Sequence, residues 1–198
     1  MSKKEELDNL EKKAILLHEC KLCKHRKHFV FGEGNAEAEI MIIGEAPGKD
    51  EDEQGRPFVG RSGQLLTRII ENGMKIKRFD IYISNIVKCR PTKGNLGEQD
   101  RPPEKEEIES ARWIIEEQIN IIKPKIILAV GNTSARFLLN TKDGITKTHG
   151  NLYDYKNIKV MPIYHPSYIL RNGGENSPLK KVVWEDIKKV MDYLGMKY

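Results

Sequence analysis

The sequence predicts one domain of three layers, α/β/α, built around a central four-stranded parallel sheet. Short apolar runs alternate along the chain with segments of helical periodicity. Strands that are apolar on both faces are typical of a parallel sheet covered by helices. The length of 198 residues is that of a single domain, so we expect residues 1–198 to form one unit.

The first expected element is an N-terminal helix over residues 5–18, because Leu7, Leu10, Ala14 and Leu17 recur at steps of three and four. The helix leads into the first cysteines. Apolar runs of four to seven residues then predict strands, and the periodic segments between them predict helices. In chain order these are strand 40–43, helix 63–72, strand 81–87, helix 104–122, strand 126–130, helix 132–139, strand 160–163 and helix 179–194.

Ligands of open parallel sheets bind beyond the carboxyl ends of the strands. Chemistry is therefore expected after Ile43, around Asn85, after Val130 and after Ile163.

The composition is compatible with a nucleic-acid partner. The chain carries 34 Lys and Arg against 29 Asp and Glu, a net charge of +5, which suits a phosphate backbone. Many lysines stand beside glutamates, however, as on solvated helix faces. The longest apolar runs, 14–17 and 126–130, are far shorter than the roughly 18 residues of a membrane span, and no secretory signal is apparent. We expect a cytoplasmic protein with no membrane partner.

The cysteine pattern indicates a metal or cluster site. Cys20 and Cys23 form a Cys-x-x-Cys pair, and Cys89 lies far away. In a cytoplasmic chain this spacing favours metal binding over a disulfide framework. A tetrahedral site takes four ligands, so the cysteines leave one position to fill.

The segment after the first expected strand is acidic, with Glu45 and Glu51 among its carboxylates. It lacks the Gly-Lys-Ser/Thr end of a Walker loop and the three spaced glycines of a dinucleotide loop. It is either a plain acidic turn or a place where carboxylates orient water or stabilise a developing cation.

The turn over residues 55–63 places Phe58 among glycines, between Arg56 and Arg61. Phe58 is either a core residue or a stacking platform for a base, with the two arginines near phosphates. Asn85 interrupts an apolar strand. It either meets a neighbouring loop or pairs with the edge of a base such as uracil or adenine.

The last expected strand is followed by His165, and the tip after it contains Ser167, Tyr168 and Arg171. A lone histidine before proline is often structural. The alternative is a polar donor backed by an apolar and basic tip that enters a nucleic-acid groove.

Taken together and in this order, these motifs resemble those of the family 4 uracil-DNA glycosylases, the iron–sulfur branch of the uracil-DNA glycosylase superfamily. The match runs from about residue 20 to residue 172. Its segments are Cys20-x-x-Cys23, Gly44-Glu45-Ala46-Pro47-Gly48 with Glu51-Asp52, Gly55-Arg56-Pro57-Phe58-Val59-Gly60, Asn85-Ile86-Val87-Lys88-Cys89-Arg90-Pro91 and His165-Pro166-Ser167-Tyr168-Ile169-Leu170-Arg171.

The resemblance implies how a flipped uracil is bound. Phe58 would stack on the base, Asn85 would read its pyrimidine edge, and the backbone around Glu45 and Ala46 would close the pocket. His165 would donate a hydrogen bond to uracil O2 as the base leaves. Flipping costs a few kcal/mol, and the tip would fill the vacated stack. The expected DNA-contacting residues are Arg56, Arg61, Ser167, Tyr168 and Arg171.

The wider superfamily pattern carries an aspartate where this chain has Ala46. Either Glu45 or Glu51 would then position the water and stabilise the oxocarbenium-like sugar, and both are candidates. No motif lysine is placed as a Schiff-base nucleophile, so hydrolysis without strand cleavage is expected.

The resemblance also implies a 4Fe-4S cluster held by four cysteines. Cys20, Cys23 and Cys89 supply three of them, and the fourth position falls on Glu109. Three outcomes are open. Glu109 ligates the fourth iron through oxygen; the corner is open or lost, as in a three-iron cluster; or the site holds zinc or nothing.

These features predict a monomeric DNA repair glycosylase that releases uracil from single- or double-stranded DNA and leaves an abasic site. The alternatives are a non-catalytic uracil- or nucleic-acid-binding module and a glycosylase of shifted specificity for hypoxanthine or xanthine. The presence of Phe58, Asn85 and His165 together favours the enzyme, because a binding module has no need of the histidine donor.

Overall fold

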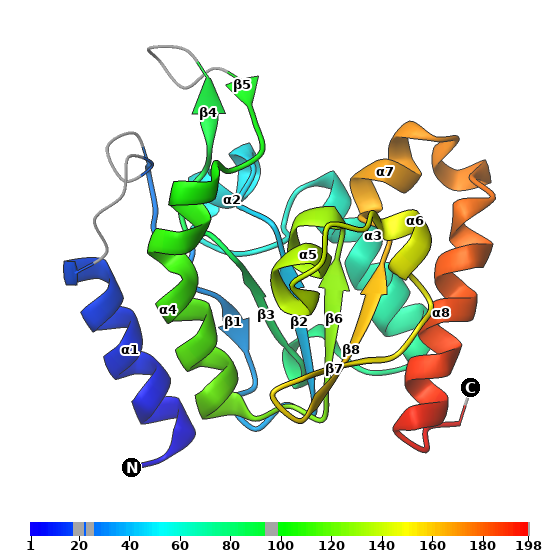
Figure 1. The fold of residues 1–198 in the computed structure, drawn as a ribbon, viewed down its shortest axis with the longest axis horizontal. Coiled ribbons are helices and arrows are strands. Elements are labelled where there is room, and N and C mark those ends of the chain that lie inside the picture. Colours follow the sequence, from blue (N-terminus) through cyan, green and yellow to red (C-terminus); the bar gives the residue numbers. More distant parts are fainter. Residues whose placement is uncertain (18–21, 23–25, 94–98, 198) are drawn as a thin grey trace.

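The chain folds around a six-stranded sheet (Figure 1). The structure is a computed structural model that describes residues 1–17, 22, 26–93 and 99–197. Three short helical segments are not α-helical: η2 (Ile69–Met74) is a π-helix, and η3 (Arg78–Asp80) and η4 (Gly174–Asn176) are 3₁₀ helices. In chain order the elements are α1 (Lys3–Leu17), β1 (Glu33–Gly34), β2 (Ile40–Gly44), α2 (Lys49–Gln54), α3 (Arg61–Arg68), η2 (Ile69–Met74), η3 (Arg78–Asp80), β3 (Tyr82–Asn85), β4 (Thr92–Lys93), β5 (Gln99–Asp100), α4 (Lys105–Ile122), β6 (Ile126–Val130), α5 (Asn132–Leu139), α6 (Ile145–Thr148), β7 (Tyr153–Tyr155), β8 (Ile158–Ile163), α7 (Pro166–Arg171), η4 (Gly174–Asn176) and α8 (Leu179–Tyr193).

The sheet has the strand order β1-β3-β2-β6-β8-β7. Its four central strands are parallel, as predicted. The edge strands β1 and β7 are antiparallel to their neighbours. They were not predicted, because segments of two and three residues are too short to show a periodic pattern. Helices α1 and α4 lie on one side of the sheet and α3 and α8 on the other (Figure 1), which confirms the three-layer α/β/α architecture.

The core explains why the strand segments are apolar without alternation. Every residue of β2, β3 and β6 is buried, because helices cover both faces of the sheet. Complete burial of a large apolar side chain stabilises the fold by about 1.5–3 kcal/mol. In α1 the buried residues are Leu7, Leu10 and Ala14, which belong to the stripe that predicted the helix. Among the described residues, no helix is long and apolar enough to cross a membrane.

Several element ends differ from the prediction for local reasons. Helix α1 begins at Lys3 rather than at residue 5, because Ser2 and Glu5 form a capping box. The Ser2 Oγ accepts the Glu5 N–H at 3.3 Å, and the Ser2 N–H donates to the Glu5 carboxylate at 2.7 Å. Helix α3 begins at Arg61 and continues through η2 to Met74. Strand β3 ends at Asn85, two residues earlier than expected.

The carboxyl ends of the parallel strands meet at one edge of the sheet. Gly44 at the end of β2 is level with Asn85 at the end of β3, and Val130 of β6 is level with Ile163 of β8. The chain leaves β2 for β3 on one side and leaves β6 for β8 on the other. The neighbouring strands β2 and β6 therefore mark the switch point of the sheet, where ligands of such folds bind.

Candidate active site

A cavity of about 790 Å³ opens at this switch point, within the range of roughly 300–1,000 Å³ that is usual for ligand sites. The ends of all four parallel strands contribute to its lining, as predicted. Arg56 is absent from the lining. The residues singled out from the sequence that line the cavity are Glu45, Ala46, Glu51, Phe58, Arg61, Asn85, His165, Ser167, Tyr168 and Arg171.

Asn85 presents an unpaired acceptor at the cavity. Its side chain is 2% exposed, and its Oδ1 is the one buried side-chain polar atom of the described residues that has no hydrogen-bond partner. Buried polar atoms in folded proteins nearly always have partners. Gly44 leaves room beside it, since a Cβ there would lie 2.4 Å from Asn85 Oδ1 and 2.4 Å from Phe58 Cζ. A ligand in the cavity could therefore supply the missing hydrogen bond.

The backbone of Asn85 is held by Lys88, a fully buried lysine. Its Nζ donates to the Asn85 carbonyl, Ser84 Oγ and Gln118 Oε1, each at 2.7 Å. Burial lowers the pKa of Lys88 well below its ordinary value. Lysine is almost never fully buried, so no sequence signal pointed to this supporting role.

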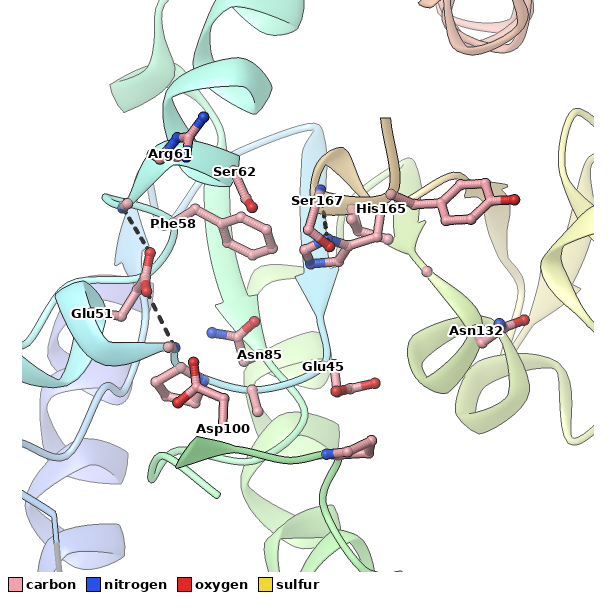
Figure 2. Close-up of a pocket in the computed structure, with 18 of the residues that line it drawn as sticks. Glu45, Glu51, Phe58, Arg61, Ser62, Asn85, Asp100, Asn132, His165 and Ser167 are labelled. Atoms are coloured by element: carbon pink, nitrogen blue, oxygen red, sulfur yellow. Dashed lines mark hydrogen bonds between the residues drawn. The ribbon is translucent and has the colours of Figure 1, made fainter. Parts of the chain in front are cut away.

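The Phe58 backbone has a φ of 50°, a strained conformation for a residue other than glycine. Arg78 holds this turn, because its guanidinium donates to the Phe58 carbonyl at 3.1 Å and to the Pro57 carbonyl at 2.5 Å. The Phe58 and His165 ring centroids lie 6.0 Å apart with an interplanar angle of 30°. In Figure 2 the two rings face each other, with the Asn85 amide below them. The strained turn therefore presents an aromatic face to the cavity.

Arg56 is bound to Glu33 instead of facing the cavity. It donates to the Glu33 carboxylate at 2.7 and 3.1 Å, and Arg78 donates to the same carboxylate at 2.8 Å. Burial raises the pKa of Glu33, but the hydrogen bonds from Arg56 and Arg78 outweigh it and lower the pKa overall. Arg56 thus supports the Phe58 turn through Glu33, and its contact with DNA stays a prediction.

His165 precedes α7, and its ring orientation is fixed by that helix. The Ser167 N–H donates to His165 Nδ1 at 3.1 Å, and Ser167 Oγ lies 2.8 Å from the same nitrogen. A backbone N–H can only donate, so the neutral ring must carry its proton on Nε2. Burial, with a smaller effect from the Arg171 charge, lowers the pKa of His165 to about 4. The ring is therefore neutral at pH 7 and presents an N–H donor.

The two candidate carboxylates differ in how their oxygens are used. Glu51 accepts the backbone N–H groups of Val59 and Gly60 on Oε1, both at 2.8 Å, and that of Gly48 on Oε2 at 3.2 Å. Glu45 accepts a hydrogen bond from Thr133 Oγ1 on Oε2. Among the described residues, Thr133 is the hydrogen-bond partner of the Glu45 carboxylate. Glu51 therefore holds loops together, whereas Glu45 keeps an oxygen for a ligand or water.

The β4–β5 ribbon adds lining residues that the sequence reasoning did not single out, among them Asp100 and Arg101. Arg101 is fixed by two hydrogen bonds, of 2.6 and 2.8 Å, to the buried Glu107 carboxylate. Glu107 also accepts the Glu104 N–H at the start of α4. These contacts join the end of the ribbon to the start of α4.

The predicted cluster ligands are only partly described. Cys20 and Cys23 lie outside the described residues. Cys89 is fully buried, and its Sγ lies 3.4 Å from Arg26 Nη1. The Glu109 side chain is 49% exposed and accepts hydrogen bonds of 2.8 and 2.7 Å from Arg112. Within the part of the chain that the structure describes, no group of three or more His, Cys, Asp or Glu side chains is arranged to hold a metal ion.

The fold and the cavity define an α/β protein with a ligand pocket at the switch point of its sheet. Residues 31–188 match the family model of the uracil DNA glycosylase superfamily. Over 200 residues the chain is 42% identical to the type-4 uracil-DNA glycosylase of Saccharolobus solfataricus, and the aligned region covers 96% of this chain and 88% of that protein. It is 43% identical over 178 residues to the type-4 uracil-DNA glycosylase of Thermotoga maritima, and the aligned region covers 88% of each chain. The chain therefore belongs to the uracil-DNA glycosylase superfamily and, within it, to the type-4 uracil-DNA glycosylases.

Proposed function

We propose that this protein is a monofunctional uracil-DNA glycosylase, which acts as a cytoplasmic monomer on uracil flipped out of single- or double-stranded DNA. A water oxygen bonds to the sugar C1′ and loses one proton, and the bond from C1′ to uracil N1 breaks. The base leaves with the bonding electrons and then takes up a proton, so that the net products are a C1′ hydroxyl and neutral uracil. The observation that carries this proposal is the buried, unpaired Oδ1 of Asn85 in a cavity that also holds the Phe58 and His165 rings.

Uracil offers an N3–H donor next to its O4 acceptor. The Asn85 carboxamide matches both, because its Oδ1 can accept from N3–H while its amide group donates to O4. Phe58 supplies a face on which the ring stacks, and such stacking contributes about 1–3 kcal/mol per base. The backbone beside Ala46 closes the pocket. This set of contacts recognises the base by its edge and by its plane.

His165 would act on the leaving group. Negative charge builds on uracil O2 as the bond to the sugar breaks, and the His165 Nε2–H is the donor that meets it. A donor that is already oriented by Ser167 loses little by reorganisation in the transition state. Because the ring is neutral at pH 7, it stabilises the uracil anion by a hydrogen bond from Nε2–H and not by a positive charge.

Glu45 is the carboxylate that we propose to position the water and stabilise the cationic sugar. Its Oε1 makes no hydrogen bond to any described residue, whereas the Glu51 oxygens accept three backbone N–H groups. Arg61, Ser167, Tyr168 and Arg171 line the same cavity and would contact the DNA around the flipped nucleotide. Contacts of arginine with phosphate make DNA binding weaken as salt rises.

An oligonucleotide with a single labelled uracil tests this function. We expect uracil release and an abasic strand that stays intact until alkali is added. Borohydride should trap no covalent complex, although Lys49 lines the cavity. Parallel oligonucleotides with hypoxanthine or xanthine test for a shifted specificity. Tight binding of the uracil strand without base release would instead identify a binding module and refute the proposal.

We also propose a 4Fe-4S cluster with Cys20, Cys23, Cys89 and Glu109 as ligands. When bound, the cluster would link the Cys20–Cys23 segment to the loop after β3 and to the start of α4. Glu109 must leave Arg112 to reach it. An exposed ion pair stabilises a protein by only about 0–1 kcal/mol, so this pairing is a small obstacle to ligation.

The fourth ligand gives a direct prediction. Glu109→Ala should lower the iron and sulfide content of anaerobically purified protein and change its electron paramagnetic resonance spectrum. Glu109→Cys should raise cluster retention, because thiolate suits iron–sulfur sites better than carboxylate. Arg112→Ala is the matched control, since it breaks the same ion pair but keeps the carboxylate, and it should leave the cluster intact. If Glu109→Ala matches the wild type in content and spectrum, Glu109 is not a ligand.

A further inference from the structure

The turn that follows β6 lies between the two elements that carry the proposed catalytic groups. In the sheet β6 has β2 on one side and β8 on the other. Glu45 follows β2, and His165 follows β8. The turn after β6 was expected to carry chemistry, but its sequence, Gly131-Asn132-Thr133, contains no acid or base. Its position suggests that it acts on its two neighbours.

The turn contacts both of those neighbours. Gly131 has a φ of 88°, and a Cβ there would lie 3.2 Å from His165 Cβ. Thr133 Oγ1 donates to Glu45 Oε2 across 88 positions of sequence. The turn is itself fixed, because Asn132 Oδ1 accepts the Ile145 N–H at 2.6 Å and Ser134 Oγ donates to the Val130 carbonyl at 2.7 Å. It is therefore a rigid support for the switch point.

The Glu45 backbone is held independently of this turn. Its carbonyl accepts the Val87 N–H at 3.2 Å, and the neighbouring Gly44 carbonyl accepts the Ile86 N–H at 3.0 Å. These bonds fix where the Glu45 side chain starts but not where its carboxylate points, since a glutamate has three side-chain torsions. Among the described residues, the Thr133 hydroxyl is the group that holds the carboxylate.

We propose that Thr133 is a positioning residue that aims the Glu45 carboxylate at the attacking water. The inference rests on the proposed role of Glu45. Thr133 is absent from the cavity lining, so it acts through Glu45 and not on the substrate. By occupying Oε2 it leaves Oε1 for water. The first turn of α5, which contains Thr133, also places its positive helix end near the carboxylate.

The test measures base release under single-turnover conditions for Thr133→Val, which keeps the shape of the side chain and removes the hydroxyl. Loss of a hydrogen bond to a charged group should slow release about 10- to 100-fold. The Kd for uracil-containing DNA and the melting temperature should stay close to the wild type. Thr133→Ser, which restores the hydroxyl, should recover most of the rate. Thr141→Val, on a threonine outside the cavity lining, is the matched control.

A double-mutant cycle with Glu45→Gln separates this proposal from the proposed function. If Thr133 acts through Glu45, Thr133→Val should add little slowing in the Glu45→Gln background. Equal slowing in both backgrounds, or a Thr133→Val enzyme of wild-type rate beside a slow Glu45→Gln enzyme, overturns the role of Thr133 alone. A Glu45→Gln enzyme of wild-type rate overturns the assignment of Glu45, and the role of Thr133 with it.

Discussion

Replacing His165 with alanine is expected to slow uracil release about 10²–10³-fold, the usual loss when one oriented donor to a developing anion is removed. The loss should appear in the rate of base release and not in DNA affinity, because the donor meets negative charge that is absent from the bound substrate. Single-turnover kinetics with a uracil-containing oligonucleotide, together with a binding titration, measure the two effects separately.

The leaving group provides a sharper control. 5-Fluorouracil is a better leaving group than uracil, so it needs less help from a donor. The His165→Ala loss should therefore be smaller with 5-fluorouracil DNA than with uracil DNA. A purely structural defect would slow both substrates equally and would contradict the assignment.

His149→Ala is a matched variant of a histidine outside the cavity lining. It should lower stability, because it leaves the buried Asp186 without its 2.9 Å partner, but it should keep the rate.

The same histidine makes a prediction about pH. Burial lowers the pKa of His165 to about 4, below the ordinary value of about 6.5. Protonation of Nδ1 would remove the acceptor of the Ser167 N–H that orients the ring. The rate of base release should therefore be unaffected near pH 6.5 and fall only towards pH 4. Between these values the unfolded chain binds a proton that the folded chain does not. This group therefore makes the free energy of unfolding fall as pH decreases through that window.

The exchange of Glu45 for glutamine should slow base release about 10²–10⁴-fold, the range attributed to a positioned general base. The melting temperature should change little, because Glu45 makes one side-chain hydrogen bond to the described residues. Glu51→Gln should instead act mainly on stability. Its amide keeps one carbonyl oxygen for the Val59 and Gly60 N–H groups but sets an NH2 group, which cannot accept, against the Gly48 N–H. The exchange should therefore lower the free energy of unfolding by about 1–3 kcal/mol.

Chemical denaturation and single-turnover rates of the two variants decide between the carboxylates. Glu51→Gln should also slow base release, since Val59 and Gly60 adjoin Phe58, but it should do so together with the loss of stability. If Glu51→Gln stayed fully stable and inactive while Glu45→Gln kept its rate, the two roles would have to be exchanged.

The parallel sheet could be predicted from the sequence because the central strands are apolar along nearly their whole length. This pattern is visible in the sequence without any knowledge of tertiary contacts. The sequence also singled out ten of the residues that line the cavity, since those residues follow the ends of strands and the ends of parallel strands converge. It missed the start of α1, although Ser2 and Glu5 have capping-box spacing. Strands β1 and β7 were missed because so few residues carry no pattern.

The functions of individual side chains needed the tertiary structure. Glu45 and Glu51 are both acidic residues of one short segment of the sequence, and the backbone N–H groups that bind Glu51 distinguish them. Arg56 pairs with Glu33, a contact that its position in the sequence does not predict. The supporting residues Arg78, Lys88 and Thr133 could not be found in the sequence, because each acts through a contact with a segment or an atom that no local pattern specifies.

The sequence by itself therefore determined the layers, the edge of the sheet where ligands bind and the residue types gathered there. These follow from burial and from strand direction, which are set by local hydrophobic patterns. The tertiary structure decided which carboxylate keeps an oxygen without a hydrogen bond and which nitrogen of His165 carries the proton. It also decided that the Asn85 acceptor is buried without a partner. Each of these depends on hydrogen bonds whose distances and directions arise only when the chain has folded.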